Sequence, residues 1–256
     1  MTDKISPGRP AATVIIMRDS PGARAEILMV ERAKTMAFAG GALVFPGGGV
    51  DESDRTLAAT LGRPLDLDET AARIAAIRET LEECGLAIAM APVPDETMRV
   101  TMRQRLAAGA TLEEAMAEHG LSLALEELVP FARWHPAAND RVSRIYDTRF
   151  YVARAPEGQI ATADGTENVH LFWSEAAALL ARCKAGAVRL IYPTRRNLER
   201  LAQFDGFSDV AAHAASISVR RITPWIEEHD GERRLCIPDD LGYPVTWEPL
   251  ETVQRS

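Results

Sequence analysis

A short stretch about a third of the way along the chain, Arg78–Leu86, most constrains what this protein can fold into and do. It carries Glu79, Glu82 and Glu83, and Gly85 near its end is typical of a helix stop. At about 100° per residue, the three carboxylates lie on one helix face. Because carboxylates this close repel one another, such a face is costly unless a cation binds to it. A ligand set made only of oxygen atoms suits Mg²⁺ or Mn²⁺, so the stretch predicts a metal-binding helix.

The alternative interpretation is an ordinary charged surface helix. Arg78 and Glu82 form an i,i+4 pair, which stabilises a helix by about 0.3 kcal/mol without any metal. A lone pair of glutamates would favour that interpretation. Here one arginine, three glutamates and one glycine stand at set spacings, and this combination favours a functional site.

The order Arg-Glu-x-x-Glu-Glu-x-Gly-aliphatic resembles the core of the Nudix box, and Phe-Pro-Gly-Gly-Gly at 45–49 resembles the strand and turn that precede it. The resemblance implies a Nudix hydrolase, a metal-dependent enzyme that cleaves a diphosphate linkage in a nucleoside-diphosphate derivative. The implied fold is α/β (α+β), a Nudix-type α/β/α sandwich with a mixed sheet. By the same resemblance, the Gly48 carbonyl ligates the metal. The uncovered backbone at Gly47 and Gly48 lets a metal or a phosphate approach closely.

Roles follow for the side chains of this stretch. Glu79 and Glu83 are assigned as principal metal ligands, with Glu82 as a further ligand. Arg78 is expected to orient a carboxylate or to contact phosphate. Two residues compete as general base, namely Glu79 itself and Glu167 in a loop outside the box.

The box departs from the family pattern in its middle. The family has a glycine, five residues, a glutamate and then seven residues before the arginine, whereas about thirty residues separate Gly48 from Arg78 here. Position 70, counted back from the arginine, is Thr70, and Glu69 is one place away. An insertion at about 52–67 therefore interrupts the box, and its first acidic residue is unassigned.

Later motifs are similar to the Nudix branch whose box carries an insertion, which includes peroxisomal coenzyme A diphosphatases. They include an Asp-Thr-Arg-Phe strand that contains Arg149, and a loop glutamate before a strand that ends at Trp173. Of the two arginines in the coenzyme A signature, only Arg32 is present, because Ala37 occupies the second place. Arg32 and Arg149 are therefore candidate substrate-binding residues, together with Gly47 of the glycine stretch. Coenzyme A or acyl-CoA, ADP-ribose, a dinucleotide or a nucleotide sugar stay open as substrates, as does a non-catalytic nucleotide sensor.

Apolar and turn residues predict the elements around this site. The helix that carries the carboxylates should bury Ile74, Ile77 and Leu81 on its opposite side. Glycines 47–49 should form a tight turn. An all-helical insertion at about 94–128 is interpreted either as a lid or pocket wall, or as a dimerisation or structural element. Further elements are strands at 13–17, 26–32, 42–45, 128–136, 146–153 and 169–173, helices at 54–65 and 176–184, and a C-terminal hairpin from 220–226 to 233–237.

Composition bounds the remaining questions. With 256 residues and 46% hydrophobic content, residues 1–256 are most simply one Nudix domain with insertions and a C-terminal extension. A net charge of −8 argues against a generic nucleic-acid binder. The sequence shows no signal peptide and no membrane span, and its three cysteines are widely spaced, which together favour a cytoplasmic protein. The expected partner is a small nucleoside-diphosphate substrate, and a homodimer is left open.

Overall fold

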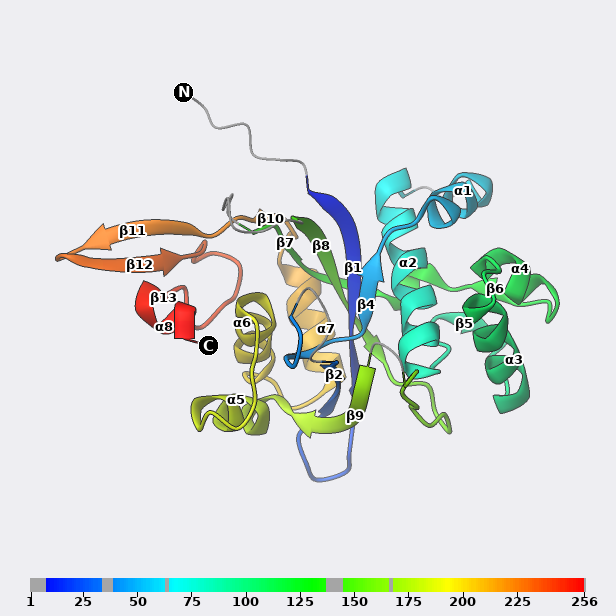
Figure 1. The fold of residues 1–256 in the computed structure, drawn as a ribbon, viewed down its shortest axis with the longest axis horizontal. Helices are drawn as coiled ribbons and strands as arrows, with labels where there is room; N and C mark the ends of the chain where they lie inside the picture. The colour runs from blue at the N-terminus through cyan, green and yellow to red at the C-terminus, as the bar shows by residue number, and fades with distance from the viewer. Residues whose placement is uncertain (1–7, 34–38, 63–64, 137–144, 166–167, 256) are drawn as a thin grey trace.

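The computed structural model describes residues 8–33, 39–62, 65–136, 145–165 and 168–255. A large mixed sheet stands between helices on both sides, so the predicted α/β/α sandwich is confirmed (Figure 1). The helices on one side are α1 (Glu52–Leu61), α2 (Leu67–Cys84), α3 (Glu96–Ala107) and α4 (Leu112–Ala117). Those on the other side are α5 (Ala176–Lys184), α6 (Tyr192–Leu201) and α7 (Phe207–Ser216).

The central sheet has eight strands and mixed directions. Its main path runs β10-β7-β8-β1-β2-β3, with β4 added to β1 and β9 added to β2. The β1–β8 and β7–β10 pairs are parallel and the others are antiparallel. The strands are β1 (Arg9–Arg18), β2 (Glu26–Arg32), β3 (Leu43–Val44), β4 (Gly47–Gly49), β7 (Val129–Trp134), β8 (Tyr146–Arg154), β9 (Asn168–Glu175) and β10 (Arg221–Ile222).

Alternating side chains of β1 feed two apolar cores, one on each face of the sheet. Val14 faces α2, where it joins a core with Ile77, whereas Ile15 joins the core that contains Leu198 of α6. The stripe predicted on the carboxylate helix is confirmed, because Ile74, Ile77 and Leu81 are all fully buried. This packing fixes α2 against the sheet and turns its glutamates toward β4.

The predicted turn at 47–49 is wrong, because these residues form strand β4. Gly48 pairs with Ala12 of β1, and Ala12 in turn pairs with Arg149 of β8. A Cβ atom at residue 47 would lie 2.3 Å from the carbonyl oxygen of Ala12, and the φ angle there is +149°. Glycine is therefore required at 47 by close strand packing, which local turn preferences do not reveal.

Both insertions contain helices where the sequence predicts them. Helix α1 lies inside the box and ends at Gly62, and α4 begins with the capping box of Thr111 and Glu114. The all-helical prediction for 94–128 is wrong in part. Strand β6 (Ser122–Leu123) pairs with β5 (Met90–Ala91), and only a 3₁₀ turn, Leu125–Glu127, follows. Such pairing between distant segments cannot be read from local helical spacing.

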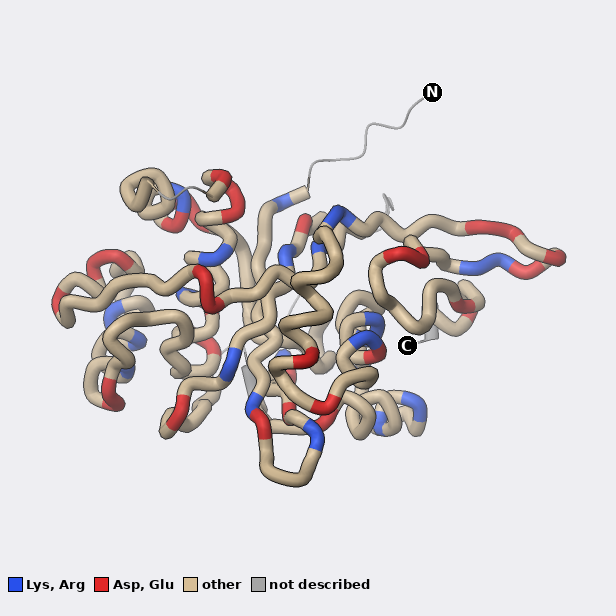
Figure 2. Tube along the Cα trace, turned by 180° about the vertical axis from the view of Figure 1, so that it is seen from behind, with Lys and Arg blue, Asp and Glu red and all other residues tan. Residues whose placement is uncertain are grey.

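A small second sheet lies near the C-terminus, formed by β11 (Trp225–His229), β12 (Glu232–Cys236) and β13 (Trp247–Pro249), and helix α8 (Leu250–Arg255) follows it. Its β11–β12 hairpin turns at Asp230 and Gly231, both with positive φ, as predicted for Asp-Gly. The hairpin extends away from the central sheet, with acidic residues gathered at its outer end (Figure 2). Within the residues described, no helix is long and apolar enough to cross a membrane.

Candidate active site

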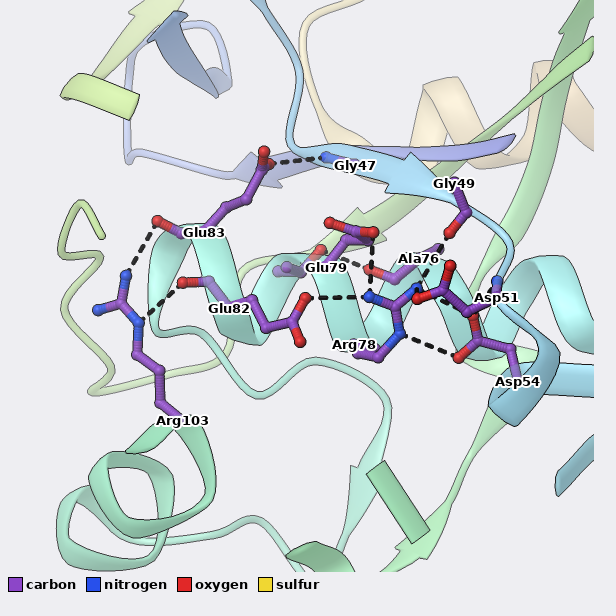
Figure 3. Close-up of polar contacts among 11 residues, drawn as sticks. Gly47, Gly49, Asp51, Asp54, Ala76, Arg78, Glu79, Glu82, Glu83 and Arg103 are labelled. Carbon is purple, nitrogen blue, oxygen red and sulfur yellow. Dashed lines mark hydrogen bonds and ion pairs between the residues drawn. The ribbon is translucent and has the colours of Figure 1, made fainter. Parts of the chain in front are cut away.

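Arg78 is the centre of the polar site on α2 (Figure 3). Its side chain is almost fully buried, and its Nε and Nη2 atoms donate to the two carboxylate oxygens of Asp54 at 3.0 and 2.9 Å. Nη1 donates to Glu79 and Glu82, both at 3.0 Å, and Nη2 also reaches the carbonyl oxygen of Gly49. All three guanidinium nitrogens are thus engaged by carboxylates or backbone. This geometry favours orientation of carboxylates over direct contact with phosphate.

Asp54 is the site residue that the sequence reasoning missed. It comes from α1, inside the box insertion, and is 1% exposed. Counting forward from Gly48 across five residues reaches Asp54, the place where the family pattern has its first acidic residue. Counting back from Arg78 across the insertion pointed instead to Glu69. Glu69 pairs with Arg73 and Arg149.

The structure brings the predicted carboxylates and glycines together. Glu83 accepts a hydrogen bond of 2.9 Å from the backbone N–H of Gly47. Glu79 lies directly against Gly48, because a Cβ atom at residue 48 would stand 2.3 Å from the carboxyl carbon of Glu79. Glu82 is on the flank nearer solvent, with its carboxylate turned to Arg78 (Figure 3). The close approach of β4 to α2 therefore depends on glycine at position 48.

Electrostatics single out Glu79 within this cluster. Its pKa is raised to about 8, chiefly by burial; Arg78 opposes this rise, and the neighbouring charges of Glu83 and Glu82 contribute to it. Burial also raises the pKa of Glu82. Four carboxylates lie within 3.4 Å of the Arg78 guanidinium, namely those of Asp51, Asp54, Glu79 and Glu82. The negative charge is not balanced within the site.

A divalent cation fits this donor set chemically. Oxygen ligands predominate, the charge surplus is negative, and the backbone at Gly48 is uncovered beside Glu79. In the side-chain conformations seen, however, no three His, Cys, Asp or Glu side chains of the described part of the chain converge on a common metal position. The carboxylate of Glu82 in particular is engaged by Arg78.

The helical insertion braces the end of α2 that carries Glu82 and Glu83. Arg103 of α3 donates to the carbonyl oxygens of Glu82 and Glu83 at 2.9 and 3.1 Å. Arg99, one turn earlier, donates to the carbonyl of Gly85 at 2.6 Å. Cations at a helix C-terminus satisfy its last carbonyls and its negative dipole end. The insertion thus fixes the position of the carboxylate face.

The other predicted site residues lie apart from this cluster or outside the described residues. Arg149 is mostly buried, and its Nε is 3.1 Å from a carboxylate oxygen of Glu69. Arg32 lies at the end of β2, where its backbone N–H donates to Ala42. Glu167, the alternative base, is outside the residues that the structure describes. Substrate binding by Arg32 and Arg149 stays a prediction.

Comparisons with known proteins agree with this geometry. Residues 7–102 match the NUDIX domain. The chain is 25% identical to the acyl-coenzyme A diphosphatase NUDT19 of Gallus gallus over 317 aligned residues, covering 95% of this chain and 82% of that protein. It is also similar to the crystal structure of a NUDIX hydrolase from Alicyclobacillus acidocaldarius. That match has a TM-score of 0.69 and 28% identity, and it covers 81% of this chain and 97% of the other. The carboxylate helix, the paired glycine strand and these matches together identify residues 7–102 as a NUDIX domain.

Proposed function

We propose that this protein is a metal-dependent diphosphatase that cleaves coenzyme A or an acyl-coenzyme A. Nudix hydrolases act in general on nucleoside-diphosphate derivatives and use divalent metal ions. The observation that carries the proposal is the unbalanced carboxylate face of α2, with Glu79 against Gly48 and Glu83 bonded to Gly47. The similarity to a relative named as an acyl-coenzyme A diphosphatase supports the substrate class.

Glu79, Glu82, Glu83 and the Gly48 carbonyl would hold Mg²⁺ or Mn²⁺. When bound, the cation supplies positive charge for the phosphoryl oxygens and lowers the pKa of a water molecule. Arg78 holds the carboxylates of Glu79 and Glu82 in place through its two 3.0 Å bonds. The N–H of Gly47 fixes Glu83 in the same way.

Glu79 is our choice of the residue that accepts the proton from the attacking water. Glu79 lies directly against Gly48 and its carboxylate is oriented by Arg78, so its position in the cluster supports this choice. Glu167, which lies outside the described residues, is the competing candidate. Glu167→Gln separates them, because Glu167 is not a proposed metal ligand: a large loss of kcat at saturating metal assigns the base to Glu167, and an unchanged kcat leaves Glu79.

The test is a substrate panel. Purified protein with Mg²⁺ or Mn²⁺ is given coenzyme A, octanoyl-coenzyme A, ADP-ribose, a dinucleoside polyphosphate and a nucleotide sugar, and the cleaved products are identified. We expect the coenzyme A compounds to have the highest kcat/KM. Preferred cleavage of another member would replace the substrate assignment. If the protein binds nucleotide but hydrolyses no member of the panel, the non-catalytic nucleotide sensor replaces the enzyme as the proposed function.

Glu83→Gln tests the site itself. Loss of this carboxylate is expected to lower kcat by about 1000-fold, because it removes metal ligation and positioning together. Thermal unfolding should change little, since the carboxylate serves the metal rather than the core. Glu113→Gln, at an exposed position of α4, is the control for a general charge effect. A wild-type kcat for Glu83→Gln would contradict the assignment of Glu83 as a metal ligand.

A further inference from the structure

A hollow of about 260 Å³ opens on the α2 face of the sheet, and none of the proposed metal ligands lines it. Its floor comes from neighbouring positions of β2 and β9, since Leu28 pairs with Trp173 in the strand register. The loop after β8 forms a second wall. The residues that line the hollow include Arg18, Leu28, Gln159, Ile160, Leu171 and Trp173.

The loop that lines this hollow is tied to the catalytic end of α2. Thr162 donates its backbone N–H to the carbonyl of Cys84 at 2.8 Å, and its hydroxyl oxygen accepts from Arg103 at 2.9 Å. The same Arg103 holds the carbonyl of Glu83. One arginine therefore links the hollow's loop to the last turn of the carboxylate helix. If the diphosphate of a substrate binds at Glu79 and Glu83, the hollow can therefore bind the part of the substrate that follows the diphosphate.

Gln159 contributes an enclosed hydrogen-bond donor. Its Oε1 atom accepts the backbone N–H of Ala87 at 2.9 Å, which fixes the orientation of the amide. Its Nε2 atom is buried and has no hydrogen-bond partner within the described ranges. A buried amide nitrogen without an acceptor is unfavourable by about 1–3 kcal/mol. A ligand carbonyl group in the hollow would satisfy it.

The other walls are apolar. Leu28 is fully buried, Leu171 is half-buried, and Ile160 projects from the loop with 76% of its surface exposed. The ring of Trp173 is covered by the guanidinium of Arg18, 4.4 Å from the ring centroid, and Arg18 is itself paired with Glu26. Because one ring face is already occupied, Trp173 forms a wall and offers less room for a stacked nucleobase. Aliphatic walls with a single free donor fit a flexible apolar chain that bears carbonyl groups.

We propose that this hollow binds the acyl-pantetheine half of the substrate, an aliphatic chain with amide and thioester carbonyl groups. Gln159 donates to one of these carbonyls, and Ile160, Leu28 and Leu171 contact the chain. The inference rests on the proposed function and extends it, because it assigns the half of the substrate beyond the diphosphate to named residues. The nucleoside half lies elsewhere along the carboxylate face.

Two variants test the hollow without touching the carboxylates. Gln159→Glu keeps an acceptor for Ala87 and the side-chain shape, but it replaces the NH₂ donor by an acceptor. Ile160→Asp places a charge on the apolar wall at an exposed position, where folding is little affected. Val93→Asp is the matched control, since Val93 is 70% exposed and does not line the hollow.

The measurement is calorimetric titration of the metal-free full-length protein with S-octanoyl-pantetheine, which carries no diphosphate, and separately with adenosine 3',5'-bisphosphate. S-octanoyl-pantetheine should bind to the wild type, and each hollow variant should weaken it about tenfold. Val93→Asp should match the wild type, and the bisphosphate should bind equally to all four proteins.

Absence of S-octanoyl-pantetheine binding, or equal binding by all four proteins, would overturn the inference. So would weakening of the bisphosphate alone in the hollow variants, which would assign the hollow to the nucleoside half. Because this probe needs neither metal nor hydrolysis, the result is independent of the substrate panel. If S-octanoyl-pantetheine binds as expected but coenzyme A compounds are not hydrolysed, the proposed reaction is refuted and the assignment of the hollow is retained.

Discussion

The two faces of the central sheet both bury charged groups, but they balance them differently. On the α6 face, Arg196 is 1% exposed and lies 2.7 Å from carboxylate oxygens of both Glu199 and Glu248. Arg200 on the same helix donates to the carbonyl of Phe131 at 2.8 Å. On the α2 face, the one guanidinium of Arg78 pairs with four carboxylates, those of Asp51, Asp54, Glu79 and Glu82.

This difference shows why burial of charge does not by itself mark a functional site. Arg195 and Arg196 are compensated by Glu199 and Glu248, and they hold the C-terminal segment, because Arg196 also donates to the carbonyl of Val245. The α2 charges leave a negative surplus and a carboxyl whose pKa rises to about 8. The surplus of one sign, next to uncovered backbone at Gly48, points to an exogenous cation.

The largest effect that tests this division is expected on the α6 face. Glu248→Ala removes the partner of Arg195 and Arg196, and it should lower the free energy of unfolding by about 3 kcal/mol because it leaves buried guanidinium groups uncompensated. The kcat of the folded fraction should not change. Urea unfolding and steady-state hydrolysis at a temperature where the variant is folded measure the two quantities.

Glu228→Ala, at an exposed position of β11, is the control for Glu248→Ala. It should leave both stability and kcat within error. A loss of kcat in Glu248→Ala that exceeds the unfolded fraction would show that the α6 face contributes to catalysis. The division between a stabilising α6 face and a functional α2 face would then be wrong.

The next largest effect concerns Asp54 on the α2 face. Asp54→Asn leaves one oxygen where Arg78 needs two, so the guanidinium should shift and release Glu79 and Glu82. We expect kcat to fall by about 30-fold and the metal concentration for half-maximal activity to rise, as for other residues that support metal ligands. Steady-state kinetics over a range of Mg²⁺ concentrations give both values.

Asp51→Asn is a matched comparison for Asp54→Asn. Asp51 also lies near Arg78, at 3.4 Å, but its side chain is 66% exposed. It should lower kcat no more than about threefold, because solvent screens this pair. If the two variants have equal kcat values, Asp54 does not position Arg78.

Asp54 also shows where prediction from sequence ended. The periodicity of Ile74, Ile77 and Leu81 and the spacing of the glutamates are local, so α2 and its polar face could be predicted. Asp54 reaches Arg78 only because α1 packs on α2, a contact between residues far apart in the sequence. Its local context is an ordinary helix first turn. In the sequence, only its position six residues after Gly48 indicated that Asp54 belongs to the site.

The glycines and Arg149 illustrate the same limit. Residues 47–49 have turn composition, and pairing with β1 makes them a strand. Arg149 has the charge of a phosphate ligand, yet Glu69, eighty positions earlier, is its neighbour. Composition and periodicity describe a residue's own segment, whereas partners across the sheet are set by tertiary packing.

A pH-dependent effect, smaller than the preceding ones per pH unit, is expected from Glu79 in metal-free protein. Its pKa of about 8 lies above the ordinary 4.5, so the folded protein keeps a proton that the unfolded chain releases. The stability from this group is fully present below about pH 4.5 and is lost as pH rises through about 8, with a slope of at most about 1.4 kcal/mol per pH unit. Urea unfolding with a chelator at several pH values measures the slope.

Saturating Mg²⁺ should remove this slope, because a bound cation favours the ionised carboxylate. Glu79→Gln should remove it without any metal. If the slope survives in Glu79→Gln, another buried acid titrates in this range. The charge surplus would then not be centred on Glu79.

The smallest effect, from His213, should have the opposite sign and belong to the α6 face. Burial, together with the charge of Arg200, lowers the pKa of His213, whose Nε2 atom accepts from Arg200 at 3.1 Å. The unfolded chain therefore binds a proton more readily, so this stability is present above about pH 6.5 and is lost as pH falls through the lowered pKa. Partial exposure of the ring keeps the effect below about 1 kcal/mol.

His213→Gln keeps an acceptor for Arg200 but does not titrate. Unfolding measured between about pH 7.5 and 5.5 should show a shallower loss of stability in this variant than in the wild type. Parallel curves would mean that the Arg200 contact does not depend on the protonation state of His213. In that case the stability of the α6 face would come from ion pairs that stay charged over this pH range. Of the two groups, only Glu79 would then make the stability of the protein depend on pH.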